Sequence, residues 1–473
     1  MIPGTTQIRD GLSARDARGP SRTASGKGGV APCRTEGRAG RRLSHSASIR
    51  RRSRQGRPVR RKPIARAAQK GFVVVPAPRR NRPGVDIMKV NALTALCIAV
   101  VLGGCQTLDR PDFSREDLAL ASPELRFESG NPDDGARFLA DLGQTPPKDG
   151  TFDLLALSSG GANGAFGAGV LVGWTARGDR PEFEVVTGVS IGALMAPFVF
   201  VGPERDEDLQ AVFTDGRTQH MLRSRGAMSP FGPALYRSGP LRKLVEEAVD
   251  DRLLSQVAHA HRQGRRLYVA TTSLDTREQV IWDLGALAAS NAPDRRERFA
   301  SILVAASSVP GAFQPVLIDL DAHGRRAREL HVDGRLSAGF FVAPESVLAA
   351  DAGTAIGTGA PGRIWVIVNG SPGETFSPAP NVGFSLMGRS LETLLNASMR
   401  SSLISTSQFA RLHGMNFAAI HAGLAGEDRP FDFDRARMNR LFDEGLRQGR
   451  DGGWTASTPA GNVDRAISIG PTS

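Results

Sequence analysis

The pentapeptide Gly188-Val189-Ser190-Ile191-Gly192 stands between two apolar runs, and the interpretation of the surrounding chain depends on it. Phe183–Thr187 before it has the length of a buried strand, and Ile191–Val201 after it has the length of a helix. A Gly-x-Ser-x-Gly turn between a strand and a helix lifts the serine hydroxyl above the sheet edge, because only glycine fits beside so sharp a turn. The helix N-terminus also favours negative charge developing at the serine. The pattern predicts that Ser190 is a nucleophile; the alternative is an ordinary tight turn that carries a serine.

A second glycine-rich turn, Ser159-Gly160-Gly161-Ala162-Asn163-Gly164, lies between the strand-like run Phe152–Leu157 and the helical pattern Phe166–Thr175. Its glycines allow backbone N–H groups to point at an anion, with a helix N-terminus behind them. A nucleotide phosphate loop is one interpretation, but the turn lacks a Gly-Lys-Ser/Thr ending, and no acidic residue is placed for a ribose. Beside a nucleophilic serine, the turn predicts an oxyanion hole formed by Gly160, Gly161 and Ala162.

Four blocks in this order resemble the patatin-like phospholipases. Leu155–Gly164 and Gly188–Ala193 look like the opening of that family's domain, and Ala305–Val316 is similar to its Ala-Ser-x-x-x-Pro…Pro segment. Val332-Asp333-Gly334 matches its Asp-Gly-Gly/Ala motif, and the likeness covers residues 151–345. The resemblance implies that Asp333 accepts the Ser190 proton directly and that water then clears an acyl-enzyme. It also implies that Gly164 and Gly334 are motif glycines, that the substrate is a lipid ester, and that no metal or cofactor is used.

The chain departs from the family pattern near both of these groups. Ser159 stands where members usually have the first of three glycines, and Asn163 replaces the basic residue that commonly follows them. Arg335 replaces the Gly or Ala after Asp333-Gly334. An arginine at that position can pair with Asp333 and lower its basicity.

Histidine is the alternative base, because it is the commonest proton acceptor for a nucleophilic serine. The chain has eight histidines, and none lies in a motif that marks a triad base. His331 lies two residues before Asp333, so the two side chains share a face if the segment is a strand. We interpret His331 as a hydrogen-bonded strand residue, with the role of base as its alternative.

Short apolar runs alternate with helical patterns from Thr151 onward, which predicts an α/β fold with three α/β/α layers and a mostly parallel central sheet. We assign residues 151–420 to a patatin-like acyl hydrolase domain and 421–473 to a C-terminal helical extension with a loose tail. Residues 105–150 are polar and broken by proline, so we interpret them as a tether with one short helix around Ala136–Leu142. The loop Gly226–Gly239 is a candidate lid. The further strands that we expect are Leu267–Thr272, Val280–Leu284, Val316–Leu320 and Ile364–Val368, and the further helices are Pro240–Val249, Leu253–Gln263, Arg296–Ala306 and Leu386–Leu412.

The positive charge of the chain is confined to its first part. Residues 1–87 contain 22 Lys+Arg and 4 Asp+Glu, a net charge of +18, so the other 38 Lys+Arg and 44 Asp+Glu sum to −6. Because this stretch is rich in Arg, Gly, Ser and Pro and lacks apolar periodicity, it is typical of a disordered segment. We interpret it as a disordered or untranslated extension; a basic arm for nucleic acid or anionic lipid is the alternative. We therefore expect no nucleic-acid partner.

Residues 88–104 resemble a lipoprotein signal peptide. Lys89 follows Met88, the apolar run Ala92–Leu102 comes next, and Leu102-Gly103-Gly104-Cys105 is similar to a bacterial lipobox. The run is too short to span a bilayer, which takes about 20 residues; a short buried helix is the alternative. We predict lipidation of Cys105, a membrane anchor there, and a position at the outer membrane facing the periplasm, favoured by Gln106. With Cys33 and Cys97 as the other cysteines and no clustered histidines, a zinc site is not expected.

The sequence thus predicts a membrane-tethered serine hydrolase that cleaves phospholipids or lysophospholipids. A generic esterase, thioesterase or serine peptidase would also use Gly-x-Ser-x-Gly. A catalytically inactive lipid-binding scaffold of the envelope is the alternative outside enzymes, since a fold does not by itself fix an activity.

Overall fold

The computed structural model describes residues 110–121, 124–224, 234–322, 324–350, 361–370, 378, 383–423 and 429–456. The chain divides into units 1–96 and 97–473, and all described residues belong to the second. The predictions for residues 1–104 and for Cys105 therefore lie outside the described residues. Within them, no helix combines the length and the apolar character that crossing a bilayer requires.

The strands of the described residues form one sheet of nine, which is the middle layer of the domain. Its order is β1-β5-β4-β3-β2-β8-β9, with β7 paired to β4 and β6 paired to β7. The run β4-β3-β2-β8-β9 is parallel throughout, and among the described strands only β5 and β7 run against the common direction. The strands are β1 (Arg126–Glu128), β2 (Phe152–Leu157), β3 (Val185–Val189), β4 (Arg266–Ser273), β5 (Gln279–Asp283), β6 (Val316–Ala322), β7 (Arg325–Asp333), β8 (Gly362–Val368) and β9 (Asn416–His421).

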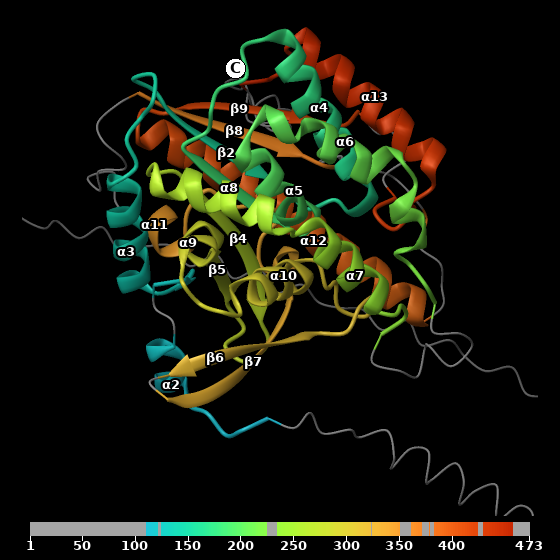
Figure 1. The fold of residues 1–473 in the computed structure, drawn as a ribbon. Coiled ribbons are helices and arrows are strands. Elements are labelled where there is room, and N and C mark those ends of the chain that lie inside the picture. Colours follow the sequence, from blue (N-terminus) through green and yellow to red (C-terminus); the bar gives the residue numbers. More distant parts are fainter. Residues whose placement is uncertain are drawn as a thin grey trace, which may run out of the picture. The chain divides into compact units, whose positions relative to one another are not determined.

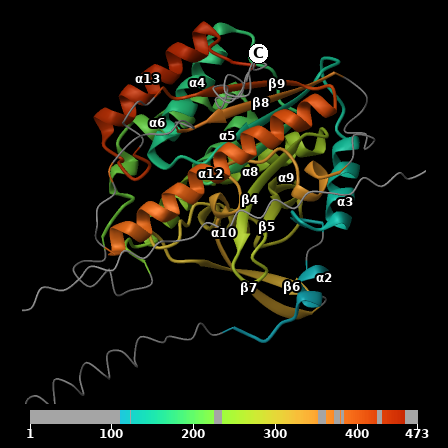
Figure 2. The same ribbon diagram turned by 180° about the vertical axis from the view of Figure 1, so that it is seen from behind.

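Helices cover both faces of this sheet and bury two separate apolar cores. One core includes side chains of α4, α5, α8, α10 and α13, and the other includes side chains of α3, α11 and α12. Figure 1 shows the first face, and Figure 2 shows α12 and α3 across the second. The predicted three-layer α/β/α fold is confirmed. The helices are α2 (Arg115–Leu120), α3 (Pro132–Gly143), α4 (Gly164–Arg177), α5 (Ile191–Val201), α6 (Asp206–Thr214), α7 (Gly239–Ala248), α8 (Asp251–Arg262), α9 (Leu284–Ala289), α10 (Arg295–Ala306), α11 (Glu345–Leu348), α12 (Gly383–Leu412) and α13 (Arg435–Asp451).

The segment predicted as a tether is instead part of the domain over residues 110–121 and 124–150. β1 adds an antiparallel strand to β5, and the side chain of Phe127 is buried there. The single helix expected around Ala136–Leu142 is the longer α3, capped by Asn131 and burying Phe138 against the sheet. The prediction was wrong because a few well-spaced apolar residues suffice for docking, even in a polar segment rich in proline and glycine.

The C-terminal helix is likewise an integral element and not an extension. α13 lies along α4 in both views, and its side chains Met438, Leu441 and Phe442 are buried in the first core (Figures 1 and 2). After α13, the backbone of Thr455 pairs with Ala419 of β9. The α/β/α domain therefore extends past residue 420, where the sequence had placed its end.

Candidate active site

Ser190 occupies a strained turn between β3 and α5. Its backbone angles are φ 56° and ψ −123°, a left-handed region that non-glycine residues rarely adopt and that costs about 1–3 kcal/mol. A Cβ at Gly188 would collide with the backbone of α5, and one at Gly192 would collide with the end of β2. The two glycines are therefore required by close backbone approach, as the motif predicts.

Strand β4 sets the position of Asp333 relative to Ser190. Val189, the last residue of β3, pairs with Ala270, and Asp333, the last residue of β7, pairs with Thr271. β5 pairs with the same residues of β4, Ala270 and Thr271, along one edge of that strand. β7 therefore pairs with the opposite edge of β4, directly after the point where β3 ends. Asp333 thus lies one step beyond Val189, where the chain turns into Ser190.

The two side chains form a direct and buried hydrogen bond. Ser190 Oγ donates to Asp333 Oδ2 at 2.6 Å, and the backbone N–H of Arg335 donates to Asp333 Oδ1 at 2.8 Å. Asp333 has no exposed surface, and Ser190 is 5% exposed. The carboxyl group is therefore held in place from both oxygens and is shielded from bulk water.

Burial raises the pKa of Asp333 to about 6, although the hydrogen bonds from Ser190 and Arg335 and the charge of Arg335 lower it. The effect expected of Arg335 is therefore present but smaller than that of burial. Its guanidinium reaches α12, where Nη2 lies 3.5 Å from Oδ1 of Asn396. With this pKa, the carboxyl is largely ionised at neutral pH and is a stronger base than an exposed aspartate.

The segment Ala305–Val316 connects the two residues through its serines. Ser307 Oγ donates to the carbonyl of Ser190 at 3.2 Å, and the carbonyl of Ser308 accepts the N–H of Asp333 at 3.0 Å. This segment therefore braces the serine turn and the end of β7 together. The resemblance identified the block, but its bracing role required the structure.

The glycine-rich turn is packed against the start of α5. A Cβ at Gly164 would overlap the side chain of Ile191, the residue after Ser190. Among the described residues, no backbone acceptor binds the N–H groups of Gly160 and Gly161, so both are available to an anion. The N–H of Ala162 donates to the carbonyl of Pro430 at 2.8 Å. Ala162 is therefore not an available donor in this structure, and that part of the predicted oxyanion hole is corrected.

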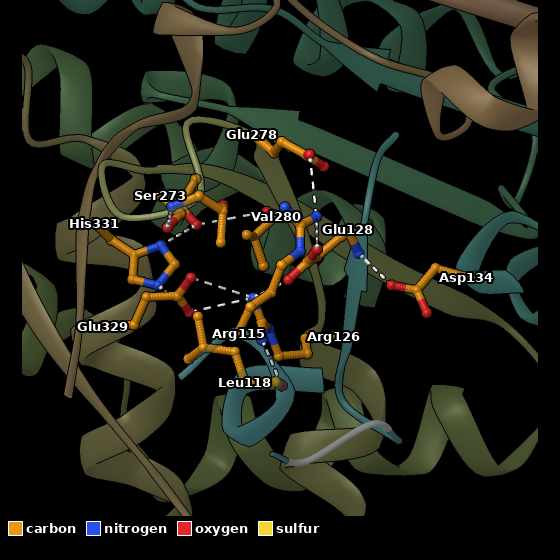
Figure 3. A network of polar contacts seen from close by, with 12 residues as sticks. Arg115, Leu118, Arg126, Glu128, Asp134, Ser273, Glu278, Val280, Glu329 and His331 are labelled. Carbon is orange, nitrogen blue, oxygen red and sulfur yellow. Dashed lines mark hydrogen bonds and ion pairs between the residues drawn. The ribbon is translucent and has the colours of Figure 1, made fainter. Parts of the chain in front are cut away.

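His331 faces a polar network and not Ser190. Its Nδ1 lies 2.9 Å from Oγ1 of Thr271, and its Nε2 lies 3.0 Å from Oε2 of Glu329 (Figure 3). Burial raises the pKa of Glu329, but the charges of His331 and Arg126 outweigh it and hold that pKa at about 2. Both ring nitrogens are thus engaged by other groups, which supports the structural interpretation of His331.

A hollow of about 470 Å³ lies beside the end of β7. Thr272, Leu274, Leu336 and Ser337 are among its lining residues, and Thr272 Oγ1 donates to the Asp333 carbonyl at 3.1 Å. A larger hollow lies at the opposite end of the strands, remote from Ser190. Most of the predicted lid, Gly226–Gly239, lies outside the described residues.

Three contributors to the site were not found from the sequence. Asn369 directly follows β8, and its backbone N–H and side-chain amide hold the hydroxyl and carbonyl of Ser158. Its position at the carboxyl end of a parallel strand, where such sheets place their sites, was an available signal. Pro430 and Arg437 contact the glycine-rich turn from the C-terminal region, and nothing in the local sequence indicates this.

Comparison with known proteins agrees with this geometry. Residues 155–344 match the family model described as Patatin-like phospholipase, a range that includes Ser190 and Asp333. These residues are similar to a patatin-like phospholipase domain. The match supports lipid acyl hydrolase activity at the level of the family. Among solved structures, VipD from Legionella pneumophila aligns with a TM-score of 0.31 and 12% identity, over 64% of this chain and 67% of that chain. The comparison with curated proteins gives no match.

Proposed function

We propose that the chain is a membrane-tethered serine hydrolase that cleaves the carboxylic esters of phospholipids or lysophospholipids through a Ser190–Asp333 dyad. The observation that carries the proposal is the 2.6 Å hydrogen bond from a strained serine to a buried carboxyl whose pKa is about 6. A serine hydroxyl needs an adjacent base to attack an ester at neutral pH, and Asp333 is in direct contact with it.

The reaction follows from the positions of these groups. Ser190 Oγ attacks the ester carbonyl carbon as its proton passes to Asp333, and the carbonyl oxygen becomes an oxyanion next to the N–H groups of Gly160 and Gly161. Collapse breaks the bond to the alcohol, which takes the proton from Asp333 and leaves an acyl-serine. Water then gives a proton to Asp333 and attacks the acyl carbon. The fatty acid departs, and the proton returns to Ser190.

Exposed apolar side chains near the end of β7 are compatible with a lipid substrate. Leu274 and Leu336 both line the hollow of about 470 Å³, and they are 40% and 36% exposed. Exposed large apolar side chains suit contact with an acyl chain.

The proposed anchor at Cys105 would hold the active-site end of the domain near the membrane. Arg110 is the first described residue, and it pairs with Asp275 in the turn after β4 while donating to the carbonyl of Arg328 on β7. Only five positions separate Arg110 from Cys105 in the sequence. We propose a position at the outer membrane facing the periplasm, which the lipobox-like Leu102–Cys105 and the following Gln106 favour.

A serine-reactive probe tests the proposal most directly. The purified protein should react with a fluorophosphonate and release fatty acid from phospholipid or lysophospholipid vesicles. Ser190→Ala should lose both activities, whereas Ser255→Ala, at an exposed serine of α8, should keep them. Labelling of the parent protein without lipid turnover would indicate a generic esterase or thioesterase. A folded protein that is neither labelled nor active would support the scaffold alternative.

A further inference from the structure

Arg437, on the first turn of α13, is buried against the glycine-rich turn. Only 4% of its surface is exposed. Its Nη2 donates a hydrogen bond of 2.6 Å to Oδ1 of Asn163, and its Nη1 donates one of 3.2 Å to the carbonyl of Asp432. Asn163 is fully buried and directly follows Ala162. A side chain 274 residues further along the chain thus holds the end of the turn.

The backbone that leads into α13 contacts the same turn. The carbonyl of Pro430 accepts the N–H of Ala162, and a Cβ at Gly161 would overlap that carbonyl oxygen. Gly161 also has a φ of +56°, so both space and backbone angle require glycine there. The turn is therefore tied at Ala162 and Asn163, and the two preceding N–H groups are left for an anion.

A close contact between helices fixes α13 relative to the turn. Gly169 and Gly173 of α4 face carbonyl oxygens of α13, and Gly445 and Gly449 of α13 face carbonyl oxygens of α4. A Cβ at any of the four would overlap the partner backbone. Gly169 faces Phe442, and Gly173, one turn later in α4, faces Leu446, one turn later in α13. The two helices therefore run parallel and lie side by side (Figure 1). The first turn of α13 is thereby held next to the start of α4, where Asn163 lies.

From these contacts we infer that Arg437 is a positioning residue of the acyl-transfer site. It acts through Asn163, by holding the glycine-rich turn with the N–H groups of Gly160 and Gly161 directed for the oxyanion. A turn of this composition samples many conformations unless it is tied, and preorganised donors are what makes an oxyanion hole effective. The permanent charge of the guanidinium adds positive potential next to the turn in a site shielded from water. The inference rests on the proposed function and assigns the C-terminal helix a part in it.

Variants at Arg437 test the role by kinetics on a soluble short-chain ester. Arg437→Met should lower kcat about ten- to a hundredfold with KM changed less than about threefold, because donor alignment acts on the transition state. Arg437→Lys should recover part of kcat, since it keeps the positive charge and can still donate a hydrogen bond. Arg447→Met, at an exposed arginine of the same helix, should behave like the parent protein. A folded Arg437→Met protein with the kcat of the parent overturns the inference.

Hydrogen exchange tests the same role without any need for activity. In the full chain, Arg437→Met should speed amide exchange across residues 159–164 and leave β3 and the first turn of α5 unchanged. Unchanged exchange in residues 159–164 overturns the inference. If the parent protein hydrolyses no ester but Arg437→Met still speeds exchange in residues 159–164, the positioning contact is supported. That result would count against the proposed function and not against the contact. If Arg437→Met does not fold, Asn163→Ala removes the same hydrogen bond, and the same two outcomes apply.

Discussion

The carboxyl group of Asp333 accepts the Ser190 hydroxyl at 2.6 Å although the two residues are 143 positions apart in the chain. Only the ionised carboxylate can take the serine proton, and burial raises its pKa to about 6. We therefore expect kcat/KM to be constant above pH 7 and to fall about tenfold per pH unit below pH 6. A profile of ester hydrolysis from pH 4.5 to 9 measures this. A profile that stays flat down to pH 4.5 would contradict Asp333 as the base.

The same shift predicts that Asp333 lowers stability at neutral pH. Its pKa is raised in the folded state, so any stability linked to its proton is fully present below about pH 3.8 and is lost as the pH rises through about 6. Asp333→Asn should therefore be more stable than the parent protein at pH 8, by up to about 3 kcal/mol. The difference should shrink toward zero at pH 4. Urea unfolding of both proteins at pH 8 and pH 4 measures this difference in stability. The same difference at both pH values would show that it does not come from the raised pKa of Asp333.

His331 should matter for stability and not for proton transfer. It contacts Glu329, which also pairs with Arg126 of β1 in the network of Figure 3. Removing one member of a buried charged group typically costs about 3–5 kcal/mol, because the remaining charges lose a partner. We expect His331→Gln to lower the thermal midpoint clearly, while the folded fraction keeps a kcat within about threefold of the parent protein, as the dyad is intact. If this variant lost as much activity as Asp333→Asn without unfolding, a histidine base would have to be considered again.

The parts of the site that lie within one local segment were predictable from the sequence. β2 and α5 have the predicted bounds, Phe152–Leu157 and Ile191–Val201, because both are continuous apolar runs that follow or precede glycine turns. The serine turn was predictable for the same reason. The partner Asp333 was found only by resemblance to a family motif.

The parts that depend on distant partners were not predictable. β7 is rich in charged residues, and its buried Glu329 pairs with Arg126, far away in the sequence, and with His331. β1 is three residues long and becomes a strand by pairing with β5. Arg437 resembles any other helical arginine until α13 is placed beside α4. In each case tertiary contacts outweigh the local pattern.

Strain at the serine turn predicts a difference between two inactive variants. Ser190→Ala keeps the φ of 56°, whereas Ser190→Gly adopts it without steric cost. Glycine at this position removes about 1–3 kcal/mol of backbone strain from the folded state. It also makes the unfolded chain more flexible, which lowers stability by about 0.5–1 kcal/mol, so the gain is larger than the loss. Ser190→Gly should therefore unfold at higher denaturant concentration than Ser190→Ala, by about 1 kcal/mol on that balance. Equal stability of the two would show that the turn is not strained.

The contact between α4 and α13 predicts opposite effects for the same substitution at two helical glycines. A Cβ at Gly445 would overlap the carbonyl of Phe166, so Gly445→Ala must push the helices apart. Forcing extra atoms into a packed contact costs about 1–3 kcal/mol. At Gly388 of α12 nothing lies within 4 Å of an added Cβ, so Gly388→Ala should stabilise the protein by about 0.5–1 kcal/mol through helix propensity. Denaturant unfolding of both variants measures the two effects.

Because α13 carries Arg437, we also expect Gly445→Ala to lower kcat and Gly388→Ala to leave it unchanged. A Gly445→Ala protein as stable and as active as the parent would show that the close approach of α4 and α13 neither stabilises the fold nor supports the site.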